Sequence, residues 1–295
     1  MPPGRAQPRP DAPVRVSRPL AAVITSKENR WLKRFRAALA GEPDEPGVVG
    51  VEGPHLVEEA LSSGAQLLAV LASPQGEKEV ERLLPAPAVR GLPLLRTTER
   101  LFASVAGTQA PQGIAALVRV PEHGLDDLLG GVPLVVILVG VQDPGNVGTV
   151  VRSAEAFGAT GLAASAGTAS PLSPKAIRAS AGSIFRLPVI VRAQPPVLLA
   201  QLKLAGVKLV ATVAASAGLR PAAAAGAAVA PHLLDLRGAV ALLVGSEPHG
   251  LPEPVLRSAD AWASIPLAAP VESLNAAVAA SVVLYEAARQ REASA

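Results

Sequence analysis

Short apolar runs that alternate with helix-like segments constrain the fold of this chain most strongly. The run VPLVVILVGV at 132–141 is almost continuously apolar, as in a strand buried on both faces, and falls far short of the roughly 20 residues of a membrane helix. Further strand-like runs follow at 160–165, 187–191, 207–213, 239–245 and 262–267, and helical segments at 147–158, 174–185 and 273–292. Strands separated by helices predict a mainly parallel sheet, so 132–292 is expected to form one α/β domain.

A second, smaller α/β domain is predicted over 20–120. Its strand-like runs lie at 47–53, 65–73, 91–98 and 113–120, and its helical segments at 54–64, 77–86 and 99–107. The polar stretch 121–131 is interpreted as the linker between the two domains. Residues 1–19, rich in Pro and Arg without periodicity, are expected to be a disordered basic tail. The Ala-rich stretch 222–230 is expected to be a loop or a weak helix.

Composition narrows the possible chemistry and the compartment. The chain has no cysteine, which excludes disulfides, thiolate metal sites and a cysteine nucleophile, and fits a reducing cytoplasm. The N-terminus has no apolar segment typical of a secretory signal, so a soluble cytoplasmic protein outside the membrane is expected.

Positive charge is concentrated in two parts of the chain. Residues 1–36 hold nine basic side chains against Asp11 and Glu28, which gives +7, whereas the whole chain carries +3, so the remainder is −4. No acidic residue occurs between Glu155 and Asp235, where there are seven Lys or Arg. Clustered cations favour a polyanion such as a nucleic acid, although a solvated basic tail is the simpler alternative.

The stretch VGVQDPGNVGTVVRSAEAFGA at 139–159 joins a strand to a helix through a loop without the usual phosphate-binding motifs. A P-loop requires Lys and Ser or Thr after its second glycine, but Asn146 and Val147 follow Gly145, and no G-x-G-x-x-G is present. A kinase or dehydrogenase is therefore disfavoured. Asn146 is placed to cap the helix, and Arg152 is expected to point away from the core. A capped helix with one exposed arginine is the structural alternative to a functional site.

Two later strand ends carry similar polar loops. LLVGSEPHGLP at 242–252 ends in Gly245, and a glycine there lets backbone approach a ligand closely, unless it only makes a tight turn. IPLAAPVESLNAAVAASVVLYEA at 265–287 places Ser273 or Asn275 as a helix cap or as a site residue. Ligands bind at the carboxyl ends of parallel strands, so the loops 140–147, 245–251 and 265–275 are predicted to form one pocket.

These three blocks together resemble the SpoU/TrmH branch of the SPOUT RNA methyltransferases. The first is similar to the family's Asn-x-Gly-x-x-x-Arg motif, the second to its Gly-x-Glu-x-x-Gly-Leu motif, and the third to its Ile-Pro…Ser-Leu-Asn motif. The matching residues are Asn146, Gly148 and Arg152; Gly245, Glu247, Gly250 and Leu251; and Ile265, Pro266, Ser273, Leu274 and Asn275. RASAGSIFRLPV at 178–189 and VEGPHLVEEAL at 51–61 also resemble family segments, the latter in its L30e-like N-terminal substrate-binding domain.

The resemblance implies a fold and a reaction. It implies a C-terminal SPOUT domain with a deep trefoil knot, a homodimer, and transfer of a methyl group from S-adenosyl-L-methionine to a ribose 2′-hydroxyl of RNA. The positions that match cofactor-binding residues are Thr212, Gly245, Gly250, Ile265 and Leu274. The sulfonium is already activated, so the protein mainly aligns the hydroxyl and helps to remove its proton, and no metal is expected.

The resemblance also assigns roles around the 2′-hydroxyl to Arg152, Asn146, Glu247, Ser273 and Asn275. Arg152 matches the residue used next to the hydroxyl; because an arginine pKa exceeds about 12, anchoring a phosphate or stabilising an alkoxide suits it better than acting as a base. Asn146 would position Arg152 or the ribose, Glu247 would orient Arg152 or Asn275, and Ser273 and Asn275 would complete the pocket. The chain departs from the family pattern at Ala268–Ala269 and Ala276–Ala277, which affects the shape of the pocket only.

The expected RNA substrate is 23S rRNA, because the N-terminal domain resembles that of rRNA-modifying members. Its basic lead-in places Trp31 among Lys27, Arg30, Lys33 and Arg34, where the ring would stack on a base or belong to the core. Transfer RNA is the alternative substrate, and a role in antibiotic resistance stays open. From other classes, a non-catalytic RNA-binding or ribosome-assembly protein and a different nucleotide enzyme are the alternatives.

Overall fold

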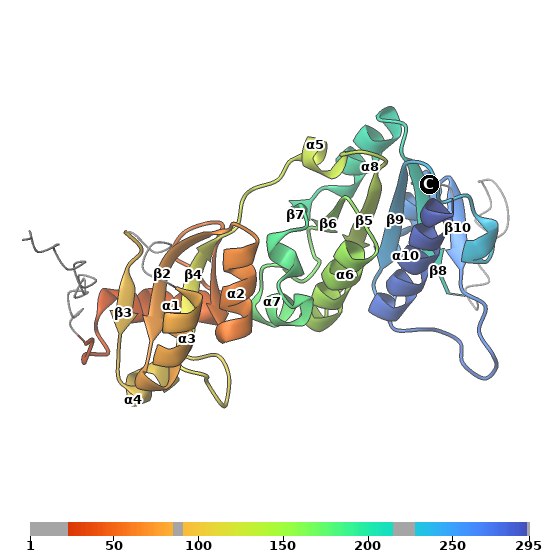
Figure 1. Ribbon diagram of the computed structural model, residues 1–295. Coiled ribbons are helices and arrows are strands. Elements are labelled where there is room, and N and C mark those ends of the chain that lie inside the picture. The colour runs from red at the N-terminus through yellow and green to blue at the C-terminus, as the bar shows by residue number, and fades with distance from the viewer. Residues whose placement is uncertain (1–22, 85–90, 215–227, 294–295) are drawn as a thin grey trace, which may run out of the picture.

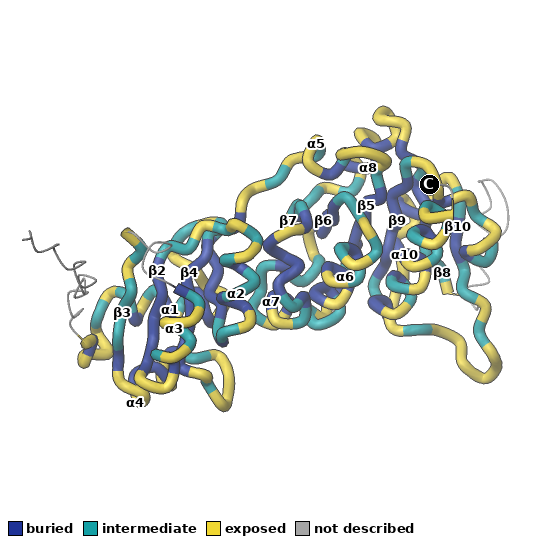
Figure 2. The backbone as a smooth tube through the Cα atoms, viewed as in Figure 1, coloured by how far each residue is buried: buried dark blue, intermediate teal, exposed yellow. Residues whose placement is uncertain are grey.

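The computed structural model describes residues 23–84, 91–214 and 228–293, which form two β-sheets with helices on both faces (Figure 1). The predicted tail at 1–19 and most of the Ala-rich stretch at 222–230 lie outside the described residues. Within these ranges, no helix combines the length and the apolarity needed to span a membrane. The buried residues follow the strands of both sheets, and the exposed residues lie on the outer sides of the helices and in the loops (Figure 2).

The N-terminal sheet has four strands in the order β1-β4-β2-β3, with β4 antiparallel to both of its neighbours. Its elements are β1 (Val48–Glu52), β2 (Gln66–Ala72), β3 (Leu94–Arg96), β4 (Ile114–Arg119), α1 (Arg30–Ala40), α2 (Pro54–Ser62), α3 (Glu77–Leu83) and α4 (Glu99–Ala103). Apolar residues of α1 and α4 cover one face of this sheet, and those of α2 and α3 cover the other. The predicted alternation of strands and helices is confirmed here.

Helix α1 was not predicted, although its signals are in the sequence. Asn29 caps the helix by accepting a hydrogen bond from the backbone of Trp31, and the helix ends at Gly41 in a left-handed conformation. Leu32 and Phe35 recur on one side and are fully buried. The density of basic residues hid this apolar spacing, because a cationic lead-in resembles a disordered tail.

The C-terminal sheet is entirely parallel, with six strands in the order β10-β8-β9-β5-β6-β7. The strands are β5 (Leu134–Val139), β6 (Gly161–Ser165), β7 (Val189–Ala193), β8 (Lys208–Val213), β9 (Val240–Gly245) and β10 (Ala261–Ser264). The helices α6 (Pro144–Ala156), α7 (Pro174–Ser180) and α10 (Ala276–Glu292) cover one face, and α5 (Leu125–Leu128), α8 (Pro195–Leu204) and α9 (Glu253–Ser258) cover the other. The α/β class is confirmed, whereas the deep trefoil knot stays a prediction.

Two local predictions in this domain were wrong, and two helices were missed. The helix expected over 174–185 breaks at Ala181 and Gly182, whose φ values are 48° and 91°, and a 3-10 turn follows at Ser183–Phe185. The helix expected from 147 begins at Pro144, because Asp143 rather than Asn146 is its N-cap. Helices α8 and α9 were not predicted, since α8 begins at Pro195 and α9 follows Pro252, in short segments without a clear polar face.

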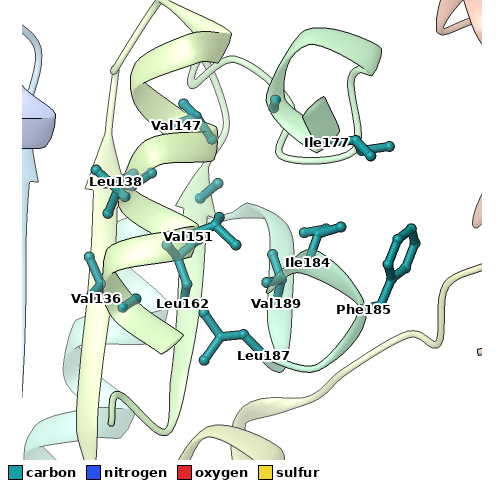
Figure 3. Packing of buried hydrophobic residues seen from close by; sticks show 14 of the residues in the cluster. Val136, Leu138, Val147, Val151, Leu162, Ile177, Ile184, Phe185, Leu187 and Val189 are labelled. Carbon is teal, nitrogen blue, oxygen red and sulfur yellow. The ribbon is translucent and has the colours of Figure 1, made fainter. Parts of the chain in front are cut away.

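The two sheets share one buried apolar cluster. Figure 3 shows part of it, with Val147 and Val151 of α6 beside Leu138 and Leu162 of the sheet, and Phe185 at its edge. The same cluster continues into the N-terminal unit through residues of α2 and β1.

A salt bridge adds to this contact between the two units, and the connector between them packs on the C-terminal unit. Arg186 donates hydrogen bonds to Glu59 of α2 and to Glu155 of α6. The predicted linker 121–131 is also anchored rather than free, because Leu128 is fully buried against Gly161.

Helix α6 is held against α7 by direct backbone contact at Gly148. A Cβ atom at this position would lie 2.2 Å from the carbonyl oxygen of Ala176 and 2.7 Å from the Cβ of Ala179. No side-chain rotation relieves a collision with a backbone carbonyl, so only glycine fits. The glycine of the first motif therefore has a packing role, because it allows the close approach of α6 to α7.

We predict that Gly148→Ala destabilises the protein although alanine favours helices. The overlap should outweigh the helix-propensity gain and lower the free energy of unfolding by about 1–3 kcal/mol. The matched control is Gly130→Ala, because a Cβ at 130 meets nothing within 4 Å. Urea unfolding of both variants checks this prediction; equal stability of the two would contradict the packing role.

Candidate active site

A cavity of about 320 Å³ lies at the carboxyl ends of β8, β9 and β10. It is lined mainly by apolar side chains and by the turns that follow these strands. Every residue predicted to bind a cofactor lies on its wall: Thr212, Gly245, Gly250, Ile265 and Leu274. Glu247 and Ser273 line it as well, so the structure brings the second and third motifs into one pocket.

The turn after β9 is both a tight turn and a wall of the cavity. Ser246 and Gly250 exchange two backbone hydrogen bonds of 3.1 and 2.8 Å, and Gly250 has a left-handed φ of 65°. A Cβ at Gly245 would lie 2.3 Å from the carbonyl carbon of Gly250. Both glycines are therefore required by the backbone, which leaves the peptide groups of the turn close to the cavity.

Three polar side chains of the predicted site form one hydrogen-bond chain beside the cavity. Asn275 donates from Nδ2 to Oδ1 of Asn146 at 3.0 Å, and Asn146 donates from Nδ2 to Oε1 of Glu247. The oxygen of Asn275 accepts the backbone N–H groups of Ala277 and Val278 at 2.9 and 3.2 Å, which caps α10. The cap fixes the orientation of the Asn275 amide. This orientation makes Asn275 the donor to Asn146, and Asn146 in turn the donor to Glu247.

Asp143 holds the start of α6 in place. Its carboxylate accepts the backbone N–H groups of Gly145 and Asn146 and binds Lys175 Nζ at 3.1 Å. The hydrogen bond from Lys175, together with those from the backbone, lowers the pKa of Asp143 below its ordinary value. With Asp143 as the cap, the side chain of Asn146 is free for the hydrogen-bond chain, which explains why the predicted capping role of Asn146 was wrong.

Arg152 lies apart from the other predicted site residues. It is exposed on α6, six residues after Asn146, which corresponds to a rotation of about 240° and a rise of about 9 Å along the helix. It does not line the cavity, and no residue in the described ranges pairs with it. The prediction that Arg152 points away from the core is confirmed. Within a single molecule, however, Arg152 does not lie beside Glu247 and Asn275.

Several apolar residues of the cavity were missed by sequence reasoning. Ala276, Ala279 and Val283 line it from α10, and Leu256 lines it from α9. The spacing i, i+3, i+7 on α10 is a signal of one helix face, but it does not distinguish a cavity from the core. The small side chain of Ala276, one of the departures from the family pattern, widens the cavity at this point.

Comparison with known proteins identifies the family. The family description "SpoU rRNA Methylase family" matches residues 133–285, which is more than half of the chain. The chain belongs to the SpoU rRNA methylase family. The description "MRM3-like substrate binding domain" matches residues 43–116. The predicted family and its N-terminal substrate-binding domain are thus confirmed.

Named relatives cover nearly the whole chain. The 23S rRNA (guanosine(2553)-2'-O)-methyltransferase RlmP of Bacillus subtilis is 34% identical over 80% of this chain and 86% of its own length. The 23S rRNA (guanosine-2'-O-)-methyltransferase RlmB of Xylella fastidiosa is 33% identical over 90% and 98%. The AdoMet-bound rRNA methyltransferase from Sinorhizobium meliloti has a TM-score of 0.77 at 31% identity, covering 91% of this chain and 98% of its own.

We predict that two substitutions of Asn275 separate its two structural roles. Asn275→Ala removes the cap of α10 and should lower the free energy of unfolding by about 0.5–2 kcal/mol. Asn275→Asp keeps an acceptor for the helix N–H groups, so it should retain stability, but it cannot donate to Asn146. Urea unfolding measures the first effect, and equal losses of stability in both variants would contradict this assignment.

Proposed function

We propose that this protein transfers a methyl group from S-adenosyl-L-methionine to a ribose 2′-hydroxyl of bacterial 23S rRNA. The observation that carries the proposal is the Asn275–Asn146–Glu247 hydrogen-bond chain at the mouth of the apolar cavity. The two named relatives that act on 23S rRNA support the choice of RNA. Because bacterial rRNA is made in the cytoplasm, we propose a cytoplasmic location.

The residues of the cavity fit S-adenosyl-L-methionine. A pocket of about 320 Å³ with mostly apolar walls suits an adenosyl group, and the exposed peptide groups of the 245–251 turn supply specific hydrogen bonds. When bound, the cofactor supplies an activated methyl group. Within this pocket Thr212 contributes mainly its methyl group, because its hydroxyl already donates to the carbonyl of Leu243 at 2.9 Å.

In this proposal the hydrogen-bond chain orients the target ribose. Glu247 receives one hydrogen bond from Asn146 and keeps its second carboxylate oxygen for a ribose hydroxyl. Asn146 and Asn275 are positioning residues. The cap of α10 fixes the amide of Asn275, and the amide of Asn275 fixes that of Asn146 through a hydrogen bond. Ser273, which is exposed at the cavity, completes the polar side of the pocket.

We infer that Arg152 serves the cavity of a second copy in a homodimer. An exposed apolar strip on α10, formed by Val278, Val282 and Tyr285 at 48, 40 and 56% exposure, borders α6. Tyr285 contacts Phe157, the residue that caps the end of α6, edge to face with ring centroids 5.8 Å apart. Burying this strip against a second copy removes apolar surface from water and brings Arg152 to the partner molecule.

In this proposal Arg152 stabilises negative charge and does not act as a base. Its guanidinium offers several N–H donors and no acceptor, so it anchors an RNA phosphate and stabilises the oxygen that attacks the methyl group. We propose that the phosphate takes the proton of the 2′-hydroxyl.

The basic lead-in has a partly structural role. Arg30 and Arg34 place their guanidinium carbons 5.8 and 5.4 Å from the ring centroid of the half-buried Trp31. Arg34 is held by Asp44 and Glu45 at 2.8 and 2.6 Å, so it is not available to RNA. We propose that Lys27 and Arg30, which are exposed, contact phosphates instead.

We predict that Arg152→Ala abolishes methyl transfer and leaves the affinity for S-adenosyl-L-methionine nearly unchanged. Arg152 does not line the cavity, so removing it should not disturb cofactor binding. The measurements are transfer from labelled S-adenosyl-L-methionine to 23S rRNA and to transfer RNA in parallel, and calorimetric binding of the cofactor. Near-normal turnover of the variant would contradict the role of Arg152, and labelling of transfer RNA alone would overturn the choice of rRNA.

Mixed dimers test whether Arg152 acts across the interface. Arg152→Ala and Glu247→Ala chains are each expected to be inactive alone. Co-expressed, they form dimers in which one site combines an intact Arg152 with an intact Glu247 from the other chain, so activity should return. If both groups act within one chain, the mixture stays inactive.

A further inference from the structure

Arg192 on the edge strand β7 is an exposed cation held in an unfavourable backbone conformation. Its φ is 57°, in the left-handed region that favours glycine, and Ala181 is the other non-glycine residue with positive φ in the described ranges. In the described part of the chain no carboxylate pairs with Arg192. Strained residues of this kind cluster at functional sites, and Arg192, unlike Ala181, carries a side chain that can bind a ligand.

Arg192 lies at the same edge of the sheet as the active site. The register pairs Ala193 with Ser165, and Ala166 donates to the carbonyl of Ala193 at 3.0 Å, so β6 and β7 end at one level. Figure 1 shows β7, β6 and β5 side by side in this order. Strands β5 and β7 are separated by one strand, so their ends lie about 10 Å apart. The end of β5 leads to Asn146.

The surface between these two strand ends carries one carboxylate, Asp143, and its charge is paired with Lys175. The loop after β6 consists of small side chains over 166–170, with Ala166, Gly167 and Ser170 exposed. No acidic residue occurs in the sequence between Glu155 and Asp235. On the next helix, Lys175 binds Asp143 and Arg178 is exposed. Gln142 lies across this edge, with its amide donating to the carbonyls of Gly140 and Gly167, so a chain of phosphates would pass over small side chains and one amide.

We propose that the RNA backbone next to the target nucleotide crosses the carboxyl edge of the sheet from Asn146 to β7, where Arg192 binds a phosphate. This inference rests on the proposed function and adds to it the side of the cavity on which the RNA chain runs. Arg192 acts on binding only, because it lies three strands from β9, which carries the turn with Glu247.

Because glycine favours the left-handed conformation of residue 192, a glycine variant loses the charge of Arg192 without losing stability. Arg192→Gly removes the cation and relaxes the backbone, Arg192→Lys keeps the cation, and Ala181→Gly relaxes the other left-handed residue without removing charge. The full-length protein is assayed on an unmodified 23S rRNA transcript for KM, kcat, thermal midpoint and the salt dependence of RNA binding.

Arg192→Gly is expected to raise KM for the transcript about three- to tenfold and to reduce the slope of log K against log salt by about 0.7–0.9, as for one lost phosphate contact. Its kcat and thermal midpoint should not fall, and Arg192→Lys and Ala181→Gly should retain the KM of the original protein. Unchanged KM and salt slope in Arg192→Gly would overturn the inference while leaving the methyl transfer itself intact.

Failure of the proposed function is distinguishable from failure of this inference. If the original protein methylates no RNA, the proposed function fails, and RNA binding is then measured directly by filter retention of the same transcript. Equal affinity and equal salt slope for the original protein and Arg192→Gly would then overturn the inference too, whereas weaker binding by Arg192→Gly supports it.

Discussion

The pairing of β5 with β9 is the constraint on which the site depends. Six consecutive residue pairs, from Leu134 with Val240 to Val139 with Gly245, bring the two strands to their ends at one level. Glu247 follows the end of β9 by two residues and Asn146 follows the end of β5 by seven, so the two side chains meet although 101 residues separate them. A shift of this register would separate the first motif from the second.

Helix capping then fixes the orientation of the polar groups at this edge. Asp143 caps α6 and leaves the side chain of Asn146 free, while Asn275 caps α10 and turns its amide toward Asn146. Two helix N-termini thus converge on Glu247, and each carries a partial positive charge.

The sequence predicted the site better than it predicted its surroundings. Glycines and polar residues after apolar strands mark strand ends, and parallel strands end at one edge, so a pocket between the loops 245–251 and 265–275 followed from local signals. The loop 140–147, predicted to belong to the same pocket, does not line the cavity. Three features did not follow. The basic residues of α1 obscured its apolar face. The helix break begins at Ala181, a residue type that favours helices, so Gly182 alone was not interpreted as the end of the helix. Arg152 is exposed and apart from the cavity, and no local signal in the sequence shows this.

The most direct test of the account is a map of 2′-O-methylated nucleotides in an unmodified 23S rRNA transcript after incubation with the protein and S-adenosyl-L-methionine. The account predicts one new methylated ribose, and none when the Asn146–Glu247 hydrogen bond is removed by Glu247→Ala. Transfer that persists at the same ribose in Glu247→Ala would contradict the central claim that this hydrogen-bond chain orients the target, and so would methylation on a base instead of a ribose.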